Sequence, residues 1–233
     1  MHKEEFITEV EKLGINITDE IMEKLDKYYK ILVEYNKHTN LTRIIEEDEV
    51  YLKHFYDSLT IVKAINLNDQ TLLDIGTGAG FPGLVLKIVF PNLKVTLVDS
   101  LNKRVTFLNN IIDELQLTNI TAVHARAEDY IENHREVYDI VTSRAVANLS
   151  ILSELSIPYV KVNGYFIPMK ADAELEIKQA KKAVETLGSV LKDIIIFKLP
   201  KEESVRMLPK IQKVTQTNKK YPRKFSEIKK KTL

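Results

Sequence analysis

Two different rhythms of hydrophobic and polar positions divide the chain. Over the first 65 residues, apolar side chains recur every three or four positions, as in Phe6, Val10 and Leu13. A second stripe, after the potential capping pair Thr18-Asp19, consists of Ile21, Leu25, Tyr28, Leu32 and Tyr35. Because a helix brings such positions to one face, this region predicts amphipathic helices. From Thr71 onward, short β-branched runs alternate with amphipathic segments, which predicts strands joined by crossover helices.

The second region predicts seven strands. Five runs end in polar or small residues: TLLDIG (71–76), KVTLVDS (94–100), NITAVHA (119–125), YDIVTSR (138–144) and GYFIPMK (164–170). Helices are expected over about 82–90, 103–115, 150–160 and 171–187. Two last runs, KDIIIFKLP (192–200) and SVRMLPKIQKVTQT (204–217), predict antiparallel strands because their link is too short for a crossover helix. We expect an α/β fold with a mostly parallel seven-stranded sheet, an N-terminal helical extension (1–65), a catalytic domain (66–217) and a basic tail (218–233).

Composition narrows the function classes. The chain has 233 residues, of which 44% are hydrophobic, enough for one sizeable core. Lys+Arg 34 balance Asp+Glu 33, so only a local patch could attract nucleic acid. Cys 0 excludes disulfides and thiolate metal sites, and the histidines are scattered, so no metal is expected. No apolar run approaches the ~20 residues that span a bilayer, and we expect a cytoplasmic monomer without a membrane partner.

The sharpest motif lies between the first strand and the following helix. It reads Asp74-Ile-Gly76-Thr-Gly78-Ala-Gly80-Phe81-Pro82-Gly83. Glycines permit a tight turn and remove the Cβ that would block a ligand's approach. Asp74, at the strand end, could orient this loop or receive a ligand's ammonium group. The second strand ends at Asp99, where a carboxylate can accept hydrogen bonds from ribose hydroxyls, or can simply cap the next helix.

Two other interpretations of the loop remain open at this point. The run from Gly78 to Gly83 also matches the dinucleotide fingerprint G-x-G-x-x-G, so a nicotinamide-dependent oxidoreductase is an alternative. Aligning the fingerprint on these glycines would place the charged Asp74 inside a buried strand, which argues against the oxidoreductase. A non-catalytic RNA-binding module with a relic pocket is a third possibility.

Further runs carry a family resemblance. They are Asn40-Leu41-Thr42, YLKHFYDSL (51–59), Phe81-Pro82-Gly83, VDSLNKR (98–104), Ser143-Arg144-Ala145 and YPRK (221–224). In this combination, over nearly its whole length, the chain resembles the RsmG family, also called glucose-inhibited division protein B, which comprises bacterial 16S rRNA guanine-N7 methyltransferases. The ending departs from the family pattern, because Phe225-Ser-Glu-Ile follows where Firmicute-type relatives usually have Gly and Pro.

The resemblance implies a Rossmann-like class I methyltransferase fold, S-adenosylmethionine as cofactor, and 16S rRNA or the small ribosomal subunit as partner. It implies a cofactor site that includes Gly76 and Phe81, Ala127 and Glu128 after the third strand, and Arg144 after the fourth. The residues alone leave plainer roles open, such as a favourable charge at a helix N-terminus for Glu128 and a surface ion pair for Arg144.

Basic residues near the expected ligand edge and in the tail are candidates for RNA binding. They are Lys53, His54, Lys103, Arg104, Lys170, Arg223 and Lys224. The tail also carries Tyr221 and Phe225, which could stack on bases. A solvated helix face and a disordered tail are the competing interpretations. If the target is guanine N7, as the resemblance implies, no general base is expected, because N7 offers a free lone pair. Arg144 would then position the cofactor or the target and would not transfer protons.

Overall fold

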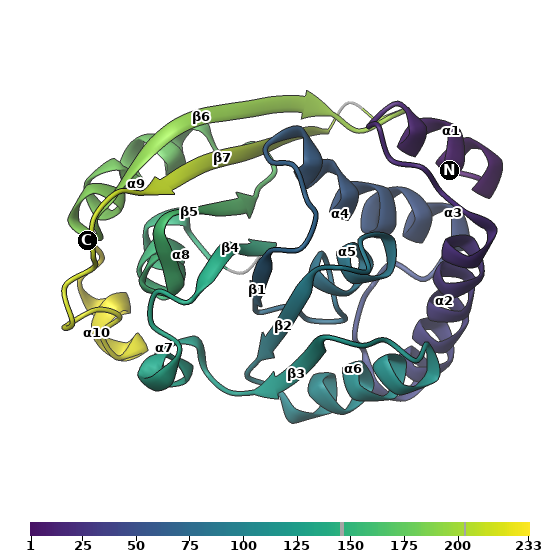
Figure 1. The fold of residues 1–233 in the computed structure, drawn as a ribbon, viewed down its shortest axis with the longest axis horizontal. Helices are drawn as coiled ribbons and strands as arrows, with labels where there is room; N and C mark the ends of the chain where they lie inside the picture. Colours follow the sequence, from purple (N-terminus) through teal and green to yellow (C-terminus); the bar gives the residue numbers. More distant parts are fainter. Residues whose placement is uncertain (145–146, 203) are drawn as a thin grey trace.

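The computed structural model describes residues 1–144, 147–202 and 204–233, and in this part of the chain seven strands form one sheet (Figure 1). The strands are β1 (Thr71–Ile75), β2 (Lys94–Asp99), β3 (Ile120–His124), β4 (Tyr138–Arg144), β5 (Val160–Met169), β6 (Ser189–Lys198) and β7 (Val205–Lys213). Their order is β3-β2-β1-β4-β5-β7-β6. The first five are parallel, while β7 runs antiparallel to both β5 and β6. The expected sheet and its antiparallel end are therefore confirmed.

Helices cover both faces of this sheet (Figure 1). They are α1 (Lys3–Glu11), α2 (Asp19–Thr39), α3 (Glu47–Val50), a π-helical segment (Tyr51–Tyr56), α4 (Asp57–Leu59), α5 (Gly83–Val89), α6 (Asn102–Glu114), α7 (Ala127–Tyr130), α8 (Leu149–Ser156), α9 (Glu174–Thr186) and α10 (Phe225–Lys230). Short 3-10 turns lie at Thr60–Lys63, Ile131–Asn133 and Ile157–Tyr159. None of the helices within the described ranges is long and apolar enough to cross a membrane.

The two faces of the sheet have separate hydrophobic cores. Leu72 and Leu97 belong to the core under α5 and α6, whereas their neighbours Leu73 and Val98 belong to the core under α8 and α9. This division follows from the alternation of side chains along a strand. Because both faces are buried, the strands read as continuous apolar runs in the sequence.

The N-terminal helices join the first of these cores. Thr18 caps α2 by accepting a hydrogen bond from the Ile21 backbone N–H at 3.3 Å. Phe6 from α1 and Tyr28 from α2 are fully buried together with Leu84 of α5. The predicted helices are thus present, while the prediction that residues 1–65 form a unit distinct from the catalytic domain stays a prediction.

Gly83 occupies a position where a side chain has no room. A Cβ at this residue would lie 2.5 Å from Leu97 Cδ2 and 2.9 Å from Asp74 Oδ2. We expect Gly83→Ala to lower the free energy of unfolding by about 1–3 kcal/mol, because an added carbon in a packed core forces its neighbours apart. Urea titration followed by circular dichroism measures this loss. An unchanged unfolding midpoint would show that α5 can shift away from β2 at little cost.

Candidate functional site

The glycine loop follows β1 at the point where the strand order reverses between β1 and β4. Open α/β sheets bind ligands at such a point, beyond the carboxyl ends of the strands. Gly76 and Thr77 donate backbone hydrogen bonds to the Val98 carbonyl at 2.8 and 3.2 Å, which ties the loop to β2. Gly78 has a φ of +62°, and a Cβ built there meets no atom within 4 Å. The loop therefore leaves open space in front of Gly78.

Gly80 and Asp74 support the loop from behind. At Gly80 a Cβ would lie 2.8 Å from the Tyr28 hydroxyl, so α2 packs directly on the loop. Asp74 is fully buried, and its Oδ2 accepts hydrogen bonds from Thr77 Oγ1 at 2.7 Å and from the Gly83 N–H at 2.9 Å. Of the two roles considered for this acid, the contacts support the orientation of the loop. Its Oδ1 has no hydrogen-bond partner among the described residues.

Asp74 lies at the expected end of its strand, one residue before β1 ends at Ile75, but its carboxyl group is completely enclosed, which the sequence did not predict. Burial raises the pKa of Asp74 to about 6, against the lowering effect of its hydrogen bonds to Thr77 and Gly83. A buried acid in β1 therefore does not discriminate between the methyltransferase frame and the dinucleotide frame.

Asp99 lies against the loop at the end of β2. It is only 2% exposed, and its two oxygens accept backbone hydrogen bonds from Gly78 and Leu101, each at 2.9 Å. Arg104 Nη1 lies 3.2 Å from Asp99 Oδ2. Arg104, a candidate for RNA binding, lines the cleft. Lys103, another candidate, instead donates through Nζ to the Thr39 carbonyl at 2.8 Å.

The loop and Asp99 line a cleft of about 430 Å³, which continues into a smaller, more apolar hollow. The cleft is lined by Leu41, Thr42, His54, Gly76, Thr77, Gly78, Ala79, Phe81, Asp99, Ser100, Arg104 and Arg144. The hollow, of about 280 Å³, is lined by Ile75, Gly76, Val98, Ser100, Ala125, Arg126, Ala127, Glu128, Leu155 and Phe225. The two spaces adjoin at Gly76 and Ser100, which line both, and together they are called the groove. Seven of the nine cofactor candidates line it, and Asp74 and Gly80 lie behind the loop.

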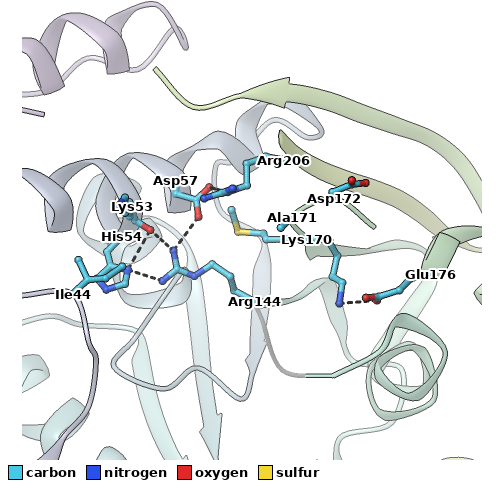
Figure 2. Close-up of a pocket in the computed structure, with 11 residues that line it drawn as sticks. Ile44, Lys53, His54, Asp57, Arg144, Lys170, Ala171, Asp172, Glu176 and Arg206 are labelled. Atoms are coloured by element: carbon cyan, nitrogen blue, oxygen red, sulfur yellow. Dashed lines mark hydrogen bonds and ion pairs between the residues drawn. The ribbon is translucent and has the colours of Figure 1, made fainter. Parts of the chain in front are cut away.

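Arg144, the last residue of β4, is the centre of a polar network (Figure 2). Its Nη1 donates to the Lys53 carbonyl at 2.9 Å and lies 3.2 Å from Asp57 Oδ2. Its Nη2 donates to His54 Nδ1 at 3.1 Å. The guanidinium carbon also lies 5.1 Å from the centre of the Phe81 ring. The side chain is therefore fixed by the segment 53–57 and by the glycine loop at once.

His54 cannot readily take up a proton. Its ring stacks on Phe81 with centroids 4.3 Å apart. Nδ1 lies 3.1 Å from Arg144 Nη2 and 3.2 Å from the Lys53 carbonyl oxygen, and Nε2 lies 3.0 Å from Thr42 Oγ1, so each ring nitrogen has a partner. Burial, together with the positive charge of Arg144, lowers the pKa of His54 to about 3. The imidazole is thus neutral, with both nitrogens engaged.

A second cavity of about 430 Å³ lies on the other side of this network (Figure 2). It is lined by Ile44, Lys53, His54, Asp57, Arg144, Met169, Lys170, Ala171, Asp172, Glu176 and Arg206. His54 and Arg144 also line the cleft, so they form the boundary between the two spaces. Three predicted RNA-binding residues, Lys53, His54 and Lys170, meet here. Lys53 Nζ pairs with Glu49 and Glu202, and Lys170 Nζ with Glu176.

The two tail candidates lie elsewhere. Arg223 forms a bidentate pair with Glu154, with Nε–Oε1 and Nη2–Oε2 distances of 2.8 and 2.6 Å. Glu154 is fully buried, so this arginine anchors the tail to α8. Lys224 is exposed at the start of α10 and lines a shallow hollow with Arg126, Glu128 and Phe225. The tail is folded against the domain (Figure 1), and RNA contacts from its exposed lysines stay a prediction.

The sequence gave no sign of Arg206 and suggested for Asp57 only a possible contact with substrate RNA. Arg206 Nε lies 3.0 Å from Asp57 Oδ1, so a nearly buried carboxylate holds two guanidiniums. The signal for Asp57 was its place in the run 51–59, but no local pattern distinguishes Arg206 from other strand residues. Ala145, which completes the run Ser143-Arg144-Ala145, lies outside the described residues. Within the described ranges, no group of three or more His, Cys, Asp or Glu side chains could hold a metal ion.

Comparison with known proteins places this geometry in a family. The family described as rRNA small subunit methyltransferase G (GidB) matches residues 21–205. A Bacillus subtilis protein named ribosomal RNA small subunit methyltransferase G is 52% identical over 228 residues, covering 96% of this chain and 95% of the relative. A Lysinibacillus sphaericus protein of the same name is 50% identical and covers 96% of both chains.

Solved structures show the same fold at low sequence identity. An S-adenosylmethionine-dependent methyltransferase from Aquifex aeolicus superposes with a TM-score of 0.55 at 18% identity, covering 75% of this chain and 97% of the other. The 16S rRNA (adenine(1408)-N(1))-methyltransferase from Catenulisporales acidiphilia gives 0.52 at 16% identity, covering 69% and 93%. These likenesses show a class I methyltransferase-like α/β fold. By its sequence along almost the whole length, the chain belongs to the rRNA small subunit methyltransferase G family.

Proposed function

We propose that this chain transfers the methyl group of S-adenosylmethionine to N7 of a guanine in the 16S rRNA of the small ribosomal subunit. The observation that carries the proposal is an identity of about 50% to ribosomal RNA small subunit methyltransferases over 96% of the chain. Guanine and its N7 come from the family resemblance. Neither the family nor the structural neighbours favour the nicotinamide-dependent oxidoreductase. We further propose that it acts in the cytoplasm as a monomer.

The residues of the groove fit this cofactor. The space in front of Gly78 would receive it without a clash, and Asp99 lies where ribose hydroxyls would be bound. Gly76, Phe81, Ala127, Glu128 and Arg144 would complete the site. When bound, S-adenosylmethionine supplies an electrophilic methyl group on a sulfonium.

The boundary residues would orient the target. The second cavity is next to the cleft across His54 and Arg144, so we assign it to the target nucleotide. Arg144 would hold the base in line with the cleft, because its own position is fixed by the Lys53 carbonyl, His54 and Asp57. Guanine N7 has a free lone pair and loses no proton during methylation. No side chain therefore has to act as a base.

The rate of methyl transfer should not depend on pH between about 7 and 8.5. His54 is neutral throughout this range because its pKa is lowered to about 3, and Asp74 titrates below it, near 6. Single-turnover rates at saturating cofactor and RNA should agree within roughly twofold, since the candidate groups keep one protonation state. A one-proton limb in this range that disappears in His54→Gln would show that the histidine acts as a base and would contradict the mechanism.

The proposed reaction is tested by incubating the protein with methyl-labelled S-adenosylmethionine and small ribosomal subunits that lack the modification. We expect label in the 16S rRNA, at a guanine that becomes sensitive to cleavage at N7-methylated positions. Label in protein only, or in another nucleotide atom, would refute the assignment. A thermal-shift comparison of S-adenosylhomocysteine with NAD tests the alternative, because only the first should raise the melting temperature.

A further inference from the structure

Part of the apolar hollow at the end of the cleft is not built by the parallel strands. Most of its lining residues lie at the ends of β1 and β2 or follow β1, β2 and β3, but Leu155 comes from α8 and Phe225 from α10 near the C-terminus. The hollow joins the polar cleft at Gly76 and Ser100, and Asp99 lies on the cleft side of this junction. A ligand with a polar end, a ribose and a flat apolar end would therefore place the flat end beside Phe225.

The tail that carries Phe225 is fixed on both sides of this residue. Arg223, two positions before it, binds the buried Glu154 through two side-chain hydrogen bonds and donates a backbone N–H at 3.0 Å. Ile228, three positions after it, is fully buried. A charge-assisted bidentate pair is among the stronger polar contacts in proteins. These two anchors hold α10 at the hollow.

The ring of Phe225 lies outside the packed cores, with the cations of Arg126 and Lys229 next to it. It is half-buried and belongs to neither hydrophobic core of the described residues. The guanidinium carbon of Arg126 lies 5.3 Å from the ring centre, and Arg126 Nε binds Glu128 Oε1 at 2.6 Å. The tail therefore contacts the turn 126–128, which lines the same hollow.

We propose that Phe225 forms the aromatic wall of the site for the adenine ring of S-adenosylmethionine, so that the C-terminal segment is part of the cofactor site. The inference rests on the proposed function. A purine offers apolar faces that suit an aromatic ring, and the hydroxyls of its ribose would reach toward Asp99. The sequence suggested a different role for this residue, stacking on RNA bases. The experiments below distinguish that role from cofactor binding.

The chain contains no tryptophan, which allows a direct optical test. In Phe225→Trp, the single tryptophan should change its emission when S-adenosylhomocysteine is added, because the adenine contacts the indole ring. Phe197→Trp, on the edge strand β6, is the matched control and should not respond. A silent Phe225→Trp variant that still binds S-adenosylhomocysteine by calorimetry would overturn the proposal.

Affinity measurements complete the test. Phe225→Ala should bind S-adenosylhomocysteine and 5′-methylthioadenosine each roughly tenfold more weakly, as expected for the loss of one base–aromatic contact. Lys230→Ala, exposed on the same helix, should bind both like the wild type. If Phe225→Ala binds both ligands with wild-type affinity, or loses only RNA binding, Phe225 does not contact the adenine ring. The proposed methyltransferase function would be unaffected by that result. Failure of the wild-type chain to bind S-adenosylhomocysteine would instead refute the proposed function.

Discussion

Arg144→Ala should slow methyl transfer about 100-fold at saturating cofactor and RNA, the size of effect expected when a reacting group is displaced by about 1 Å. The guanidinium lines both the cleft and the second cavity, and it is held by the Lys53 carbonyl, His54 and Asp57. Without the guanidinium, no group at this position sets the distance between the cofactor and the target base. Single-turnover kinetics measures the loss.

The fold should survive this substitution. Asp57 keeps its contact with Arg206 at 3.0 Å, so no buried carboxylate is left without a partner. Arg144→Lys is the matched variant, because it retains the charge but cannot reach three acceptors with a planar fork, and its rate should lie between those of alanine and wild type. If Arg144→Ala methylates within threefold of wild type at an unchanged melting temperature, Arg144 does not position the reacting groups.

Most of the fold could be predicted because the central strands, such as β1 and β4, are short runs with two buried faces. The expected run 138–144 coincides with β4, whereas β5 begins at Val160, four residues before the expected run. The reason is an irregular register, since Val160 pairs with Tyr138 before the regular pairing starts at Tyr165 with Ile140. Helix α7 was considered only through the alternative role of Glu128 as a charge at a helix N-terminus, because four residues are too few to show a helical period.

The site was predictable only where it is local in sequence. The glycine loop and Asp99 could be identified because strand ends and turns are encoded by neighbouring residues. The network around Asp57 joins residues 87 and 149 positions apart, and depends on the register of β7, which no local pattern specifies. The tail was interpreted from its charge and its two aromatic residues, yet its position is set by Arg223 and a buried glutamate 69 positions earlier. Long-range ion pairs of this kind need the tertiary structure.

Gly78→Val should weaken cofactor binding about 100-fold. A Cβ at Gly78 meets no protein atom, so the valine methyl groups would occupy the cleft space that the proposed function assigns to S-adenosylmethionine. Overpacking of about 3 kcal/mol corresponds to a loss of roughly 100-fold in affinity for S-adenosylhomocysteine. The substitution also places a β-branched residue at a φ of +62°, which itself strains the backbone.

Gly14→Val separates the two effects, because Gly14 has a φ of +79°, equally open surroundings and a place outside the cleft. Both variants should lose stability by about 1–2 kcal/mol, but only Gly78→Val should lose binding in calorimetry. Equal affinities in the two folded variants would mean that the cofactor does not approach the glycine loop.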